Sequence, residues 1–483
     1  MGALIAVVSK EGANVYDVAV TMLETLTHRG RDAFGIASPH KIVVKGSLEE
    51  LRKERIDSCT LIGHSLAKIF PRDEAQPVKY QDSTLAFDGR LFPAHTKSEV
   101  NSLVEKLMNS ADKAAHLIRK FNGAYVLAFA EDERIVVGRD AVGTRPLYFG
   151  ENENLCAVAS ERKALWKIGI IDAGSFSPGN LAVIDEGGFR FEVAKTITQT
   201  SLQRLDLKTA AQKLKQVLLQ STKGHVSDLK EVAVAFSGGI DSSIVAFSAK
   251  LCHVDVHLVC VSLEETKESV FAERAATALD LPFYHIAYSI ADLEEILPKV
   301  LWLIEESNPV NVGIATPTFW VAEQSSKLGL KVLMSGQGGD EAFGGYHRYL
   351  EEYERHGSAG LQRKIYRDTV SSYESNFQRD NKVCVFNNVE LRTPLTDLKV
   401  VQFALGLPTE LKINSPQDML RKRVLREAGR ELGIPKFIVE KPKKAIQYTT
   451  GVSKAMKELA KKEGLTLQRY LKRIFLKAYG MLG

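Results

Sequence analysis

The chain has 483 residues, of which 45% are hydrophobic and 25% charged, and its formal net charge is +5. This length exceeds what one hydrophobic core usually supports, so the composition predicts a soluble globular protein with two domains. The small net charge gives no reason to expect a nucleic-acid or membrane partner, whereas it leaves a small anionic substrate open.

The five cysteines form no C-x-x-C pair. This usage predicts a protein of the reducing cytosol, without a disulfide framework or a zinc site. The first residues, Met-Gly-Ala-Leu-Ile-Ala-Val-Val, are too few for the apolar core of a signal peptide and follow no basic segment, so we predict a first strand and a cytoplasmic location. No stretch approaches the length of a membrane span.

Residues 1–195 show short strand patterns separated by turns, with helical periodicity over Val15–Thr27 and Val100–Phe121. Such a mixture indicates stacked sheets with flanking helices. Examples of the strands predicted in this part are Leu4–Val8, Leu85–Phe87, Tyr125–Ala130, Arg134–Val137, Leu147–Phe149 and Leu155–Ala159.

A polar, threonine-rich stretch over residues 190–207 separates the two predicted domains, 1–195 and 200–483. Beyond it, strands and helices alternate, which predicts a parallel sheet with crossover helices and with ligands at the carboxyl ends of the strands. The predicted strands are Val232–Phe236, Val254–Val261, Phe283–Ala287 and Lys331–Met334. The predicted helices lie around Lys208–Thr222, from Asp241 onward, and around Ser269–Leu279, Asp292–Leu303 and Thr316–Leu328.

The first of these strands runs into the loop Ser237-Gly-Gly-Ile-Asp-Ser-Ser243 and then into a helix. A glycine turn lets backbone N–H groups approach an anion at the helix N-terminus, and the serine hydroxyls with Asp241 suit phosphates and their metal ion. The loop lacks the spacing and the lysine of a Walker loop, so it does not indicate a kinase or motor ATPase. The alternative is an ordinary strand–turn–helix whose small residues serve packing.

The strand at Lys331–Met334 runs into a second glycine-rich loop, Ser335-Gly-Gln-Gly-Gly-Asp-Glu-Ala-Phe-Gly-Gly-Tyr346. Two aspartates from two such loops, Asp241 and Asp340, can share a magnesium ion on a polyphosphate. The alternative is that Asp340 and Glu341 only cap the next helix.

Residues 453–477 place eight lysines and arginines around apolar positions. This pattern favours a solvated amphipathic helix over a nucleic-acid-binding tail.

In the C-terminal half, four motifs resemble the glutamine-hydrolysing asparagine synthetases. They are Ser237–Ser243, Ser335–Glu341 with Gly344-Gly-Tyr346, Glu390-Leu-Arg-Thr-Pro-Leu-Thr-Asp397 and Lys441-Pro-Lys-Lys-Ala-Ile446. The first motif alone also fits other pyrophosphate-releasing enzymes, such as NAD synthetase or tRNA thiolases, but the set in this order is specific. The resemblance implies a Rossmann-like parallel-sheet synthetase domain of the PP-loop type.

The N-terminal half resembles the glutaminase domain of the same family, and this implies an αββα sandwich of the N-terminal-nucleophile hydrolases. The matching stretches are His28-Arg-Gly-Arg-Asp32, Phe121-Asn-Gly-Ala-Tyr125, Gly138–Tyr148 and Ser160-Glu-Arg-Lys-Ala164.

The N-terminal half also departs from the family where glutamine would react. The family has a cysteine nucleophile at residue 2, where this chain has Gly2, so no acyl-enzyme can form. The oxyanion-hole Asn-Gly of the family appears as Asp88-Gly89, and a carboxylate there has the wrong sign. The glutamine-holding arginine aligns with Leu66 or Ser65, and the acidic residue for its α-amino group falls near Lys97. We therefore expect a retained scaffold, which shields the synthetase site or forms subunit contacts as in a homodimer, rather than a repurposed binding site.

The resemblance also implies roles for single residues. Ser237, Gly238, Gly239 and Ser242 would contact pyrophosphate, Asp241 and Asp340 would bind Mg²⁺, and Ala235, Val261 and Gly336 would form the adenine pocket for ATP. Lys443 would neutralise the charge that grows as pyrophosphate leaves, with Lys441 and Lys444 as neighbouring candidates. Arg392, Glu390 and Gln337 are candidates for reading the acceptor substrate.

The leading hypothesis is an AMP-forming amide ligase that adenylates a carboxylate, most simply aspartate, and aminates it with free ammonia instead of glutamine. A second hypothesis is an enzyme similar to the β-lactam synthetases, with an amine other than ammonia as acceptor; against it, the base tyrosine of those enzymes appears here as Gln337. A third is a non-catalytic regulator on the same scaffold, which the retention of Asp241, Asp340 and Lys443 disfavours.

Overall fold

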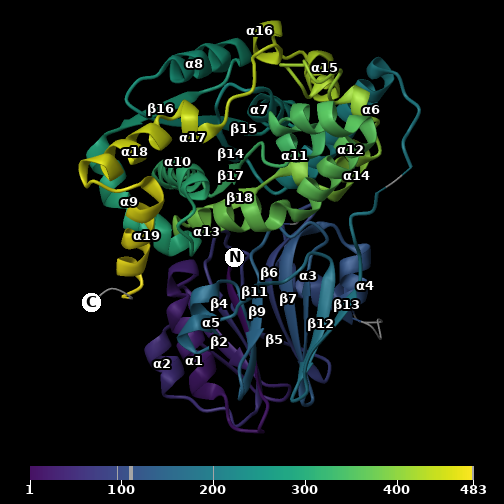
Figure 1. The fold of residues 1–483 in the computed structure, drawn as a ribbon. Coiled ribbons are helices and arrows are strands. Elements are labelled where there is room, and N and C mark those ends of the chain that lie inside the picture. The colour runs from purple at the N-terminus through teal and green to yellow at the C-terminus, as the bar shows by residue number, and fades with distance from the viewer. Residues whose placement is uncertain (95, 108–112, 200, 481–483) are drawn as a thin grey trace. The chain divides into compact units, whose positions relative to one another are not determined.

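A computed structural model describes residues 1–94, 96–107, 113–199 and 201–480 (Figure 1). The chain divides into two compact units, Met1–Thr196 and Ile197–Gly483, and the division falls within the threonine-rich stretch. Within the described ranges, no helix has the length and apolar composition that crossing a membrane requires.

The first unit contains two antiparallel sheets. The seven-stranded sheet has the order β11-β9-β10-β1-β4-β2-β3 and the six-stranded sheet the order β13-β12-β8-β7-β6-β5. In the first sheet, the strands are β1 (Gly2–Ser9), β2 (Ala33–Ala37), β3 (Ile42–Lys45), β4 (Thr60–Leu66), β9 (Tyr148–Glu151), β10 (Leu155–Ala159) and β11 (Gly174–Ser175). In the second, they are β5 (Val78–Tyr80), β6 (Ser83–Leu91), β7 (Gly123–Glu131), β8 (Arg134–Arg139), β12 (Asn180–Asp185) and β13 (Gly188–Val193).

Strand β1 shows why these sheets stack. All eight of its residues are buried, because both of its faces are covered. Leu4, Ala6 and Val8 belong to the core between the two sheets, whereas alternate residues such as Ile5 point to a second core under the helices α1 (Tyr16–Thr25), α2 (Leu48–Arg52) and α5 (Arg162–Lys167).

A third core lies between the six-stranded sheet and the helices α3 (Glu99–Leu107) and α4 (Lys113–Lys120). The predicted αββα sandwich is thus confirmed, with helices on both outer faces (Figure 1). The single helix predicted over Val100–Phe121 is described as two helices, and residues 108–112 between them lie outside the described residues. The strands named from the sequence do not include β2, β3, β4, β5, β11, β12 and β13.

The second unit is built on a five-stranded sheet of order β16-β15-β14-β17-β18, in which every neighbouring pair is parallel. Its strands are β14 (Glu231–Ala235), β15 (Asp255–Leu263), β16 (Phe283–Tyr288), β17 (Val332–Met334) and β18 (Glu390–Arg392). The predicted parallel sheet is confirmed, and only β18 was not foreseen.

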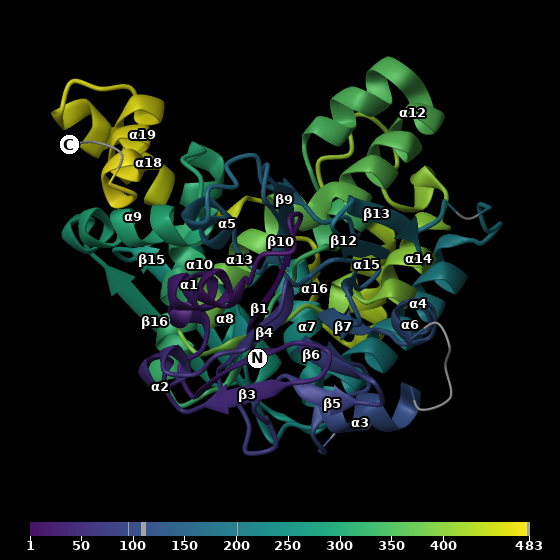
Figure 2. The same cartoon turned by 90° about the horizontal axis from the view of Figure 1, so that it is seen from below.

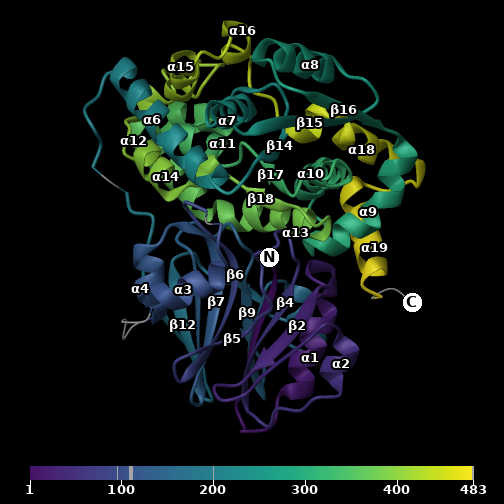
Figure 3. The ribbon, with the colours of Figure 1, turned by 180° about the vertical axis from the view of Figure 1, so that it is seen from behind.

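Helices cover both faces of this sheet (Figure 3). On one side lie α6 (Leu207–Val226), α7 (Ile240–Leu251) and α8 (Lys267–Leu279); on the other lie α9 (Ile290–Ile304), α10 (Pro309–Lys327) and α13 (Gln378–Phe386). The remaining α-helices are α11 (Gly339–Phe343), α12 (Arg348–Ser372), α14 (Leu398–Leu405), α15 (Arg423–Leu432), α16 (Lys436–Val439), α17 (Ile446–Thr449), α18 (Val452–Lys462) and α19 (Leu467–Ala478). A π-helical turn (Tyr373–Phe377) and two 3₁₀ turns (Pro394–Thr396 and Thr409–Leu411) complete this unit's described helical elements.

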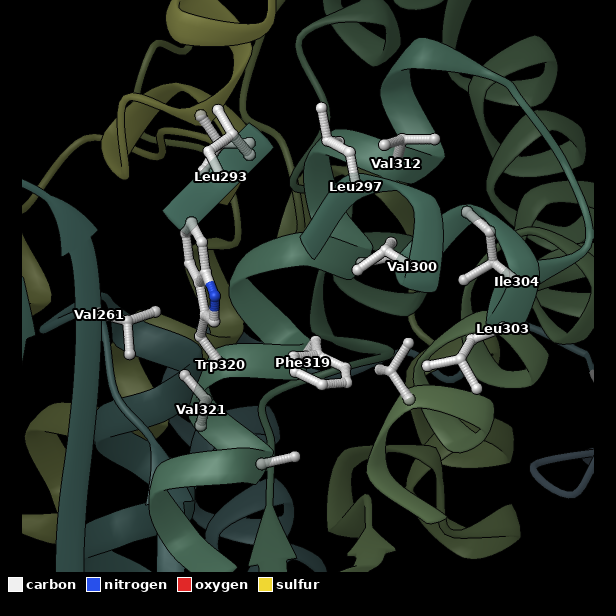
Figure 4. Close-up of a cluster of buried hydrophobic side chains, with 14 of the residues drawn as sticks. Val261, Leu293, Leu297, Val300, Leu303, Ile304, Val312, Phe319, Trp320 and Val321 are labelled. Carbon is white, nitrogen blue, oxygen red and sulfur yellow. The ribbon is translucent and has the colours of Figure 1, made fainter. Parts of the chain in front are cut away.

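A hydrophobic core lies between the sheet and the helices α9 and α10. Trp320 of α10 lies between Val261 of β15 and Leu293 of α9, and Phe319 faces Val300 (Figure 4). Burying such side chains contributes roughly 1.5–3 kcal/mol each, which fixes the strand ends where the loops begin.

The basic segment 453–477 forms α18 and α19, whose apolar faces include Leu459, Tyr470 and Leu471 in the same core (Figure 2). All eight of its lysines and arginines are exposed. The prediction of a solvated amphipathic segment is therefore confirmed, but the segment forms two helices rather than one.

Candidate active site

The two glycine-rich loops meet because β14 and β17 are neighbours in the sheet, with Ala233 paired to Leu333. Gly238 has a φ of +66°, a conformation that favours glycine and that starts the tight turn into α7. A Cβ atom at Gly336 would lie 2.7 Å from the Cβ atom of Asp241, so only glycine lets the second loop approach the first this closely. The hydroxyl group of Ser242 accepts from the backbone N–H of Ser237 at 3.3 Å, which closes the first loop on itself.

Two carboxylates and two ammonium groups meet at this junction. The Nζ atom of Lys422 lies 2.5 Å from Asp241 Oδ2 and 2.6 Å from Asp340 Oδ1. The Nζ atom of Lys443 lies 2.6 Å from Asp340 Oδ2 and 3.9 Å from Asp241 Oδ2. The ion pair between Asp340 and Lys443 thus brings together two residues that are far apart in the sequence.

The protonation states of the group follow from this pairing. Burial alone would raise the pKa of Asp340, but the ammonium groups of Lys422 and Lys443 outweigh it and hold that pKa well below its usual range. Burial alone would lower the pKa of Lys443, but the charges of Asp340 and Asp241 raise it above its usual value. At neutral pH the Asp340 carboxylate is therefore ionised and Lys443 is charged.

The group opens into a cavity of about 650 Å³. Nine of the predicted site residues line it: Ala235, Ser237, Asp241, Ser242, Val261, Gly336, Gln337, Asp340 and Lys443. Gly238 and Gly239 form the turn between Ser237 and α7. Because its lining includes apolar Ala235 and Val261 as well as the charged group, the cavity can hold a base and a polyphosphate at once.

One wall of the cavity was not predicted from the sequence. It is formed by the π-helical turn and the residues next to it. Asn376 donates to Glu341 Oε1 at 2.6 Å, and the Tyr346 hydroxyl donates to the same oxygen at 2.5 Å. Burial and the charge of Asp340 raise the pKa of Glu341. Gln337 donates its amide hydrogen to the Asp380 carboxylate. π-Helical turns often mark functional sites, but a single sequence carries no pattern that reveals one.

Arg392 is not brought to the cavity. Its guanidinium is bound on three sides, by Glu390 Oε1 at 2.8 Å, by both carboxylate oxygens of Asp228 at 2.6 and 3.0 Å, and by the backbone carbonyl of His225. With 1% of its side chain exposed, it cannot reach a substrate. The expectation that Arg392 and Glu390 read the acceptor was therefore wrong, because the strand β18 turns both side chains into a buried ion-pair network.

We expect the variant Arg392→Met to unfold more easily by about 3–5 kcal/mol, because it leaves Asp228 and Glu390 buried without their counter-charge. Urea unfolding of the full chain measures this loss. The folded fraction should still bind ATP with unchanged affinity in calorimetry, and a specific loss of ATP or acceptor binding without a stability change would contradict the structural role.

Asp241 and Asp340 are the residues that could hold a divalent metal. Asp241 Oδ1 is buried and accepts no hydrogen bond from the described residues, so an acceptor oxygen is left for a cation. Across the described ranges, no group of three or more histidines, cysteines, aspartates or glutamates is placed to hold a metal. Two carboxylates alone fit Mg²⁺, which usually takes its remaining ligands from water and substrate phosphates.

In the first unit, residue 2 has no room for a side chain. The Gly2 N–H donates to Asp88 Oδ1 at 2.9 Å, and a Cβ atom at Gly2 would overlap the carbonyl oxygen of Ser65. Arg29 donates to the Gly2 carbonyl at 2.9 Å and pairs with the buried Glu161 at 2.8 Å. Where the resemblance places a nucleophile, this chain therefore has a closed network of backbone and ion pairs.

Comparison with known families bears on both units. A family model described as asparagine synthase matches residues 213–360 and 351–477, which is more than half of the chain. The chain belongs to the asparagine synthase family. A second model, described as a glutamine amidotransferase domain, matches residues 66–167. ATP-dependent formation of a carbon–nitrogen bond is the chemistry of this family.

Two relatives show how far sequences within the family diverge. The protein named "Putative asparagine synthetase (glutamine-hydrolyzing) 1" of Methanocaldococcus jannaschii is 28% identical and aligns over 93% of this chain and 94% of its own. Asparagine synthetase B (glutamine-hydrolyzing) of Escherichia coli is 26% identical over 68% of this chain and 60% of its own. Among solved structures, an allosteric regulatory enzyme of purine biosynthesis aligns with 59% of this chain and 64% of its own at 16% identity, with a TM-score of 0.36.

Proposed function

We propose that this protein is an AMP-forming amide ligase that activates the side-chain carboxylate of aspartate with ATP and aminates it with free ammonia. The observation that carries the proposal is the meeting of Asp241, Asp340 and Lys443 with the Ser237–Ser242 loop around one cavity of about 650 Å³. Membership of the asparagine synthase family supports the ATP-dependent ligase activity. The choice of aspartate, ammonia and Mg²⁺ is our proposal.

The proposed chemistry begins with the carboxylate oxygen attacking the α-phosphate of ATP. The bond to pyrophosphate breaks, and an acyl-adenylate forms. The Ser237–Ser242 loop binds the leaving pyrophosphate through backbone N–H groups and hydroxyls, and Lys443 offsets its growing charge. Mg²⁺, held by Asp241 and Asp340, would neutralise phosphate charge when bound. Ammonia then attacks the acyl carbon, AMP leaves, and the lost proton passes to solvent.

The first unit supports free ammonia as the proposed nitrogen source. Glutamine hydrolysis in this family requires a nucleophilic side chain at residue 2, and Gly2 supplies neither the side chain nor the space for one. In addition, the positive charges of Arg145 and Arg29 outweigh the effect of burial and lower the pKa of Asp88. A carboxylate at that position opposes a developing oxyanion. Free ammonia is therefore the donor we propose.

Pyrophosphate release by the purified protein tests this function. With ATP, Mg²⁺ and aspartate, ammonium should support equal amounts of AMP, pyrophosphate and asparagine, while glutamine should give no more product than its contaminating ammonium. Release of glutamate from glutamine would contradict the proposed donor. Release of pyrophosphate from another carboxylate without any added amine would instead favour an internal amine acceptor.

A further inference from the structure

Lys422 is the member of the charged group that no motif indicated. Its side chain has no exposed surface, whereas 27% of the Lys443 side chain is exposed. Lys443 thus faces the cavity, while Lys422 lies beneath the two carboxylates and touches both, at 2.5 and 2.6 Å. A buried lysine in contact with two carboxylates replaces a cation that the pair would otherwise need.

The backbone is built to place this ammonium group. Arg421 and Lys422 have φ values of +51° and +53°, a left-handed conformation that costs residues other than glycine roughly 1–2 kcal/mol each. Such strain persists only where the surroundings over-determine it. Here the Arg421 guanidinium donates to the Gly345 carbonyl at 3.0 Å, and the Arg426 guanidinium donates to the Arg421 carbonyl at 2.8 Å.

Gly345 makes the space for the pair. A Cβ atom at this position would overlap both Asp340 Oδ1 and the Cε atom of Lys422. The loop glycine therefore serves the contact between Lys422 and Asp340, and any larger residue would force the two apart.

The charges of the group balance in the absence of ligand. Asp241 and Asp340 carry two negative charges, and Lys422 and Lys443 carry two positive ones. Arg421, whose charge acts on Asp340, adds a further positive charge nearby, and Glu341, which acts on Lys443, adds a further carboxylate. A free divalent cation would thus enter a region without net negative charge, at the cost of repulsion from the buried ammonium groups.

We infer that Lys422, together with Lys443, neutralises the aspartate pair in the nucleotide-free protein, so that the site takes up magnesium only together with a polyphosphate. The phosphates bring the negative charge that the site itself does not offer. Lys422 is accordingly a positioning residue, which contacts both carboxylates and holds them in place before the metal arrives. This inference rests on the polyphosphate site of the proposed function. It adds that the metal enters this site only with the polyphosphate.

Thermal unfolding of the full chain tests the inference without nucleotide, aspartate or ammonium. For the unmodified chain, millimolar Mg²⁺ at constant ionic strength should leave the midpoint within about 1 °C, whereas Mg²⁺ with inorganic pyrophosphate should raise it by several degrees. Lys422→Met should lower the midpoint by roughly 5–10 °C, and Mg²⁺ alone should now restore at least half of that loss, because the carboxylates have lost a counter-charge.

Lys382→Met is the matched control. Lys382 is equally buried and pairs with Glu305 at 2.5 Å, away from the cavity lining. Its loss should lower the midpoint as well, but without any response to Mg²⁺. A second variant, Lys422→Met with Asp241→Asn, removes the repulsion and should regain stability without Mg²⁺, and it keeps the test valid if Lys422→Met alone fails to fold.

Two results would overturn the inference: stabilisation of the unmodified chain by Mg²⁺ alone to the same extent as by Mg²⁺ with pyrophosphate, or a double variant that is no more stable than Lys422→Met. Failure of the proposed function would appear differently. A chain that shows the expected magnesium response but forms no amide would overturn the ligase proposal and leave the charge balance in place.

Discussion

The variant Lys443→Met is expected to release pyrophosphate about 100- to 1,000-fold more slowly than the unmodified chain, with a smaller change in the KM for ATP. The lysine is charged at neutral pH, because Asp340 and Asp241 outweigh burial and raise its pKa. Its Nζ atom stands 2.6 Å from Asp340 Oδ2 at the cavity, where negative charge grows as pyrophosphate leaves. An interaction that strengthens in the transition state acts mainly on kcat. A steady-state pyrophosphate assay with saturating aspartate and ammonium measures both constants.

Lys444→Met is the control on the same segment. Lys444 is 62% exposed and pairs with Glu268 at 2.6 Å, so its removal should change the rate by no more than about twofold. Lys441 has a different contact from Lys443 and Lys444. Its ammonium group donates to the Ser237 carbonyl at 3.1 Å and thus supports the backbone of the first glycine-rich loop. Equal losses in Lys443→Met and Lys444→Met would assign the effect to the segment rather than to Lys443.

The phosphate side of the site could be predicted from sequence because its determinants are local. A buried strand, a glycine turn and a helix start are consecutive in the chain, and a parallel sheet brings such loops to one edge. Asp241 and Asp340 were found in this way, although 99 positions apart in the printed sequence. The order of the strands, with β14 beside β17, then brought the two loops together.

The remainder of the site depends on tertiary placement that no local pattern records. Lys422 stands in a run of basic residues, Arg421-Lys-Arg423, that is typical of a solvated surface, and only its left-handed backbone turns it inward. Arg392 shows the opposite error: a motif residue expected at the acceptor is neutralised by Asp228, which lies on the segment after α6. The wall of the cavity around Asn376 is formed by the π-helical turn, which has no sequence signature.

The variant Gly2→Cys is expected not to gain glutamine-dependent activity and to be less stable than the unmodified chain by about 1–3 kcal/mol or more. A Cβ atom at residue 2 would overlap the Ser65 carbonyl, because β1 and β4 are paired there through Gly2 and Leu66. Glutamate release from glutamine and urea unfolding measure the two effects. Gly2→Ala is the matched control, and it should lose the same stability, since the overlap involves the Cβ atom and not the thiol.

Restoring the local charge should not rescue glutamine use either. In the double variant Gly2→Cys with Asp88→Asn, an amide replaces the carboxylate that opposes an oxyanion, but the overlap with Ser65 persists. Asp88 also accepts the Gly2 N–H and lies 3.8 Å from Arg29, so its replacement removes a charge that Arg29 faces in a buried setting. Glutamate production by the double variant would show that the backbone of β1 can shift to admit a side chain. Its absence, with ammonium-dependent synthesis intact, is the expected result, and it agrees with the replacement of the glutamine-holding residues at Leu66 or Ser65 and near Lys97.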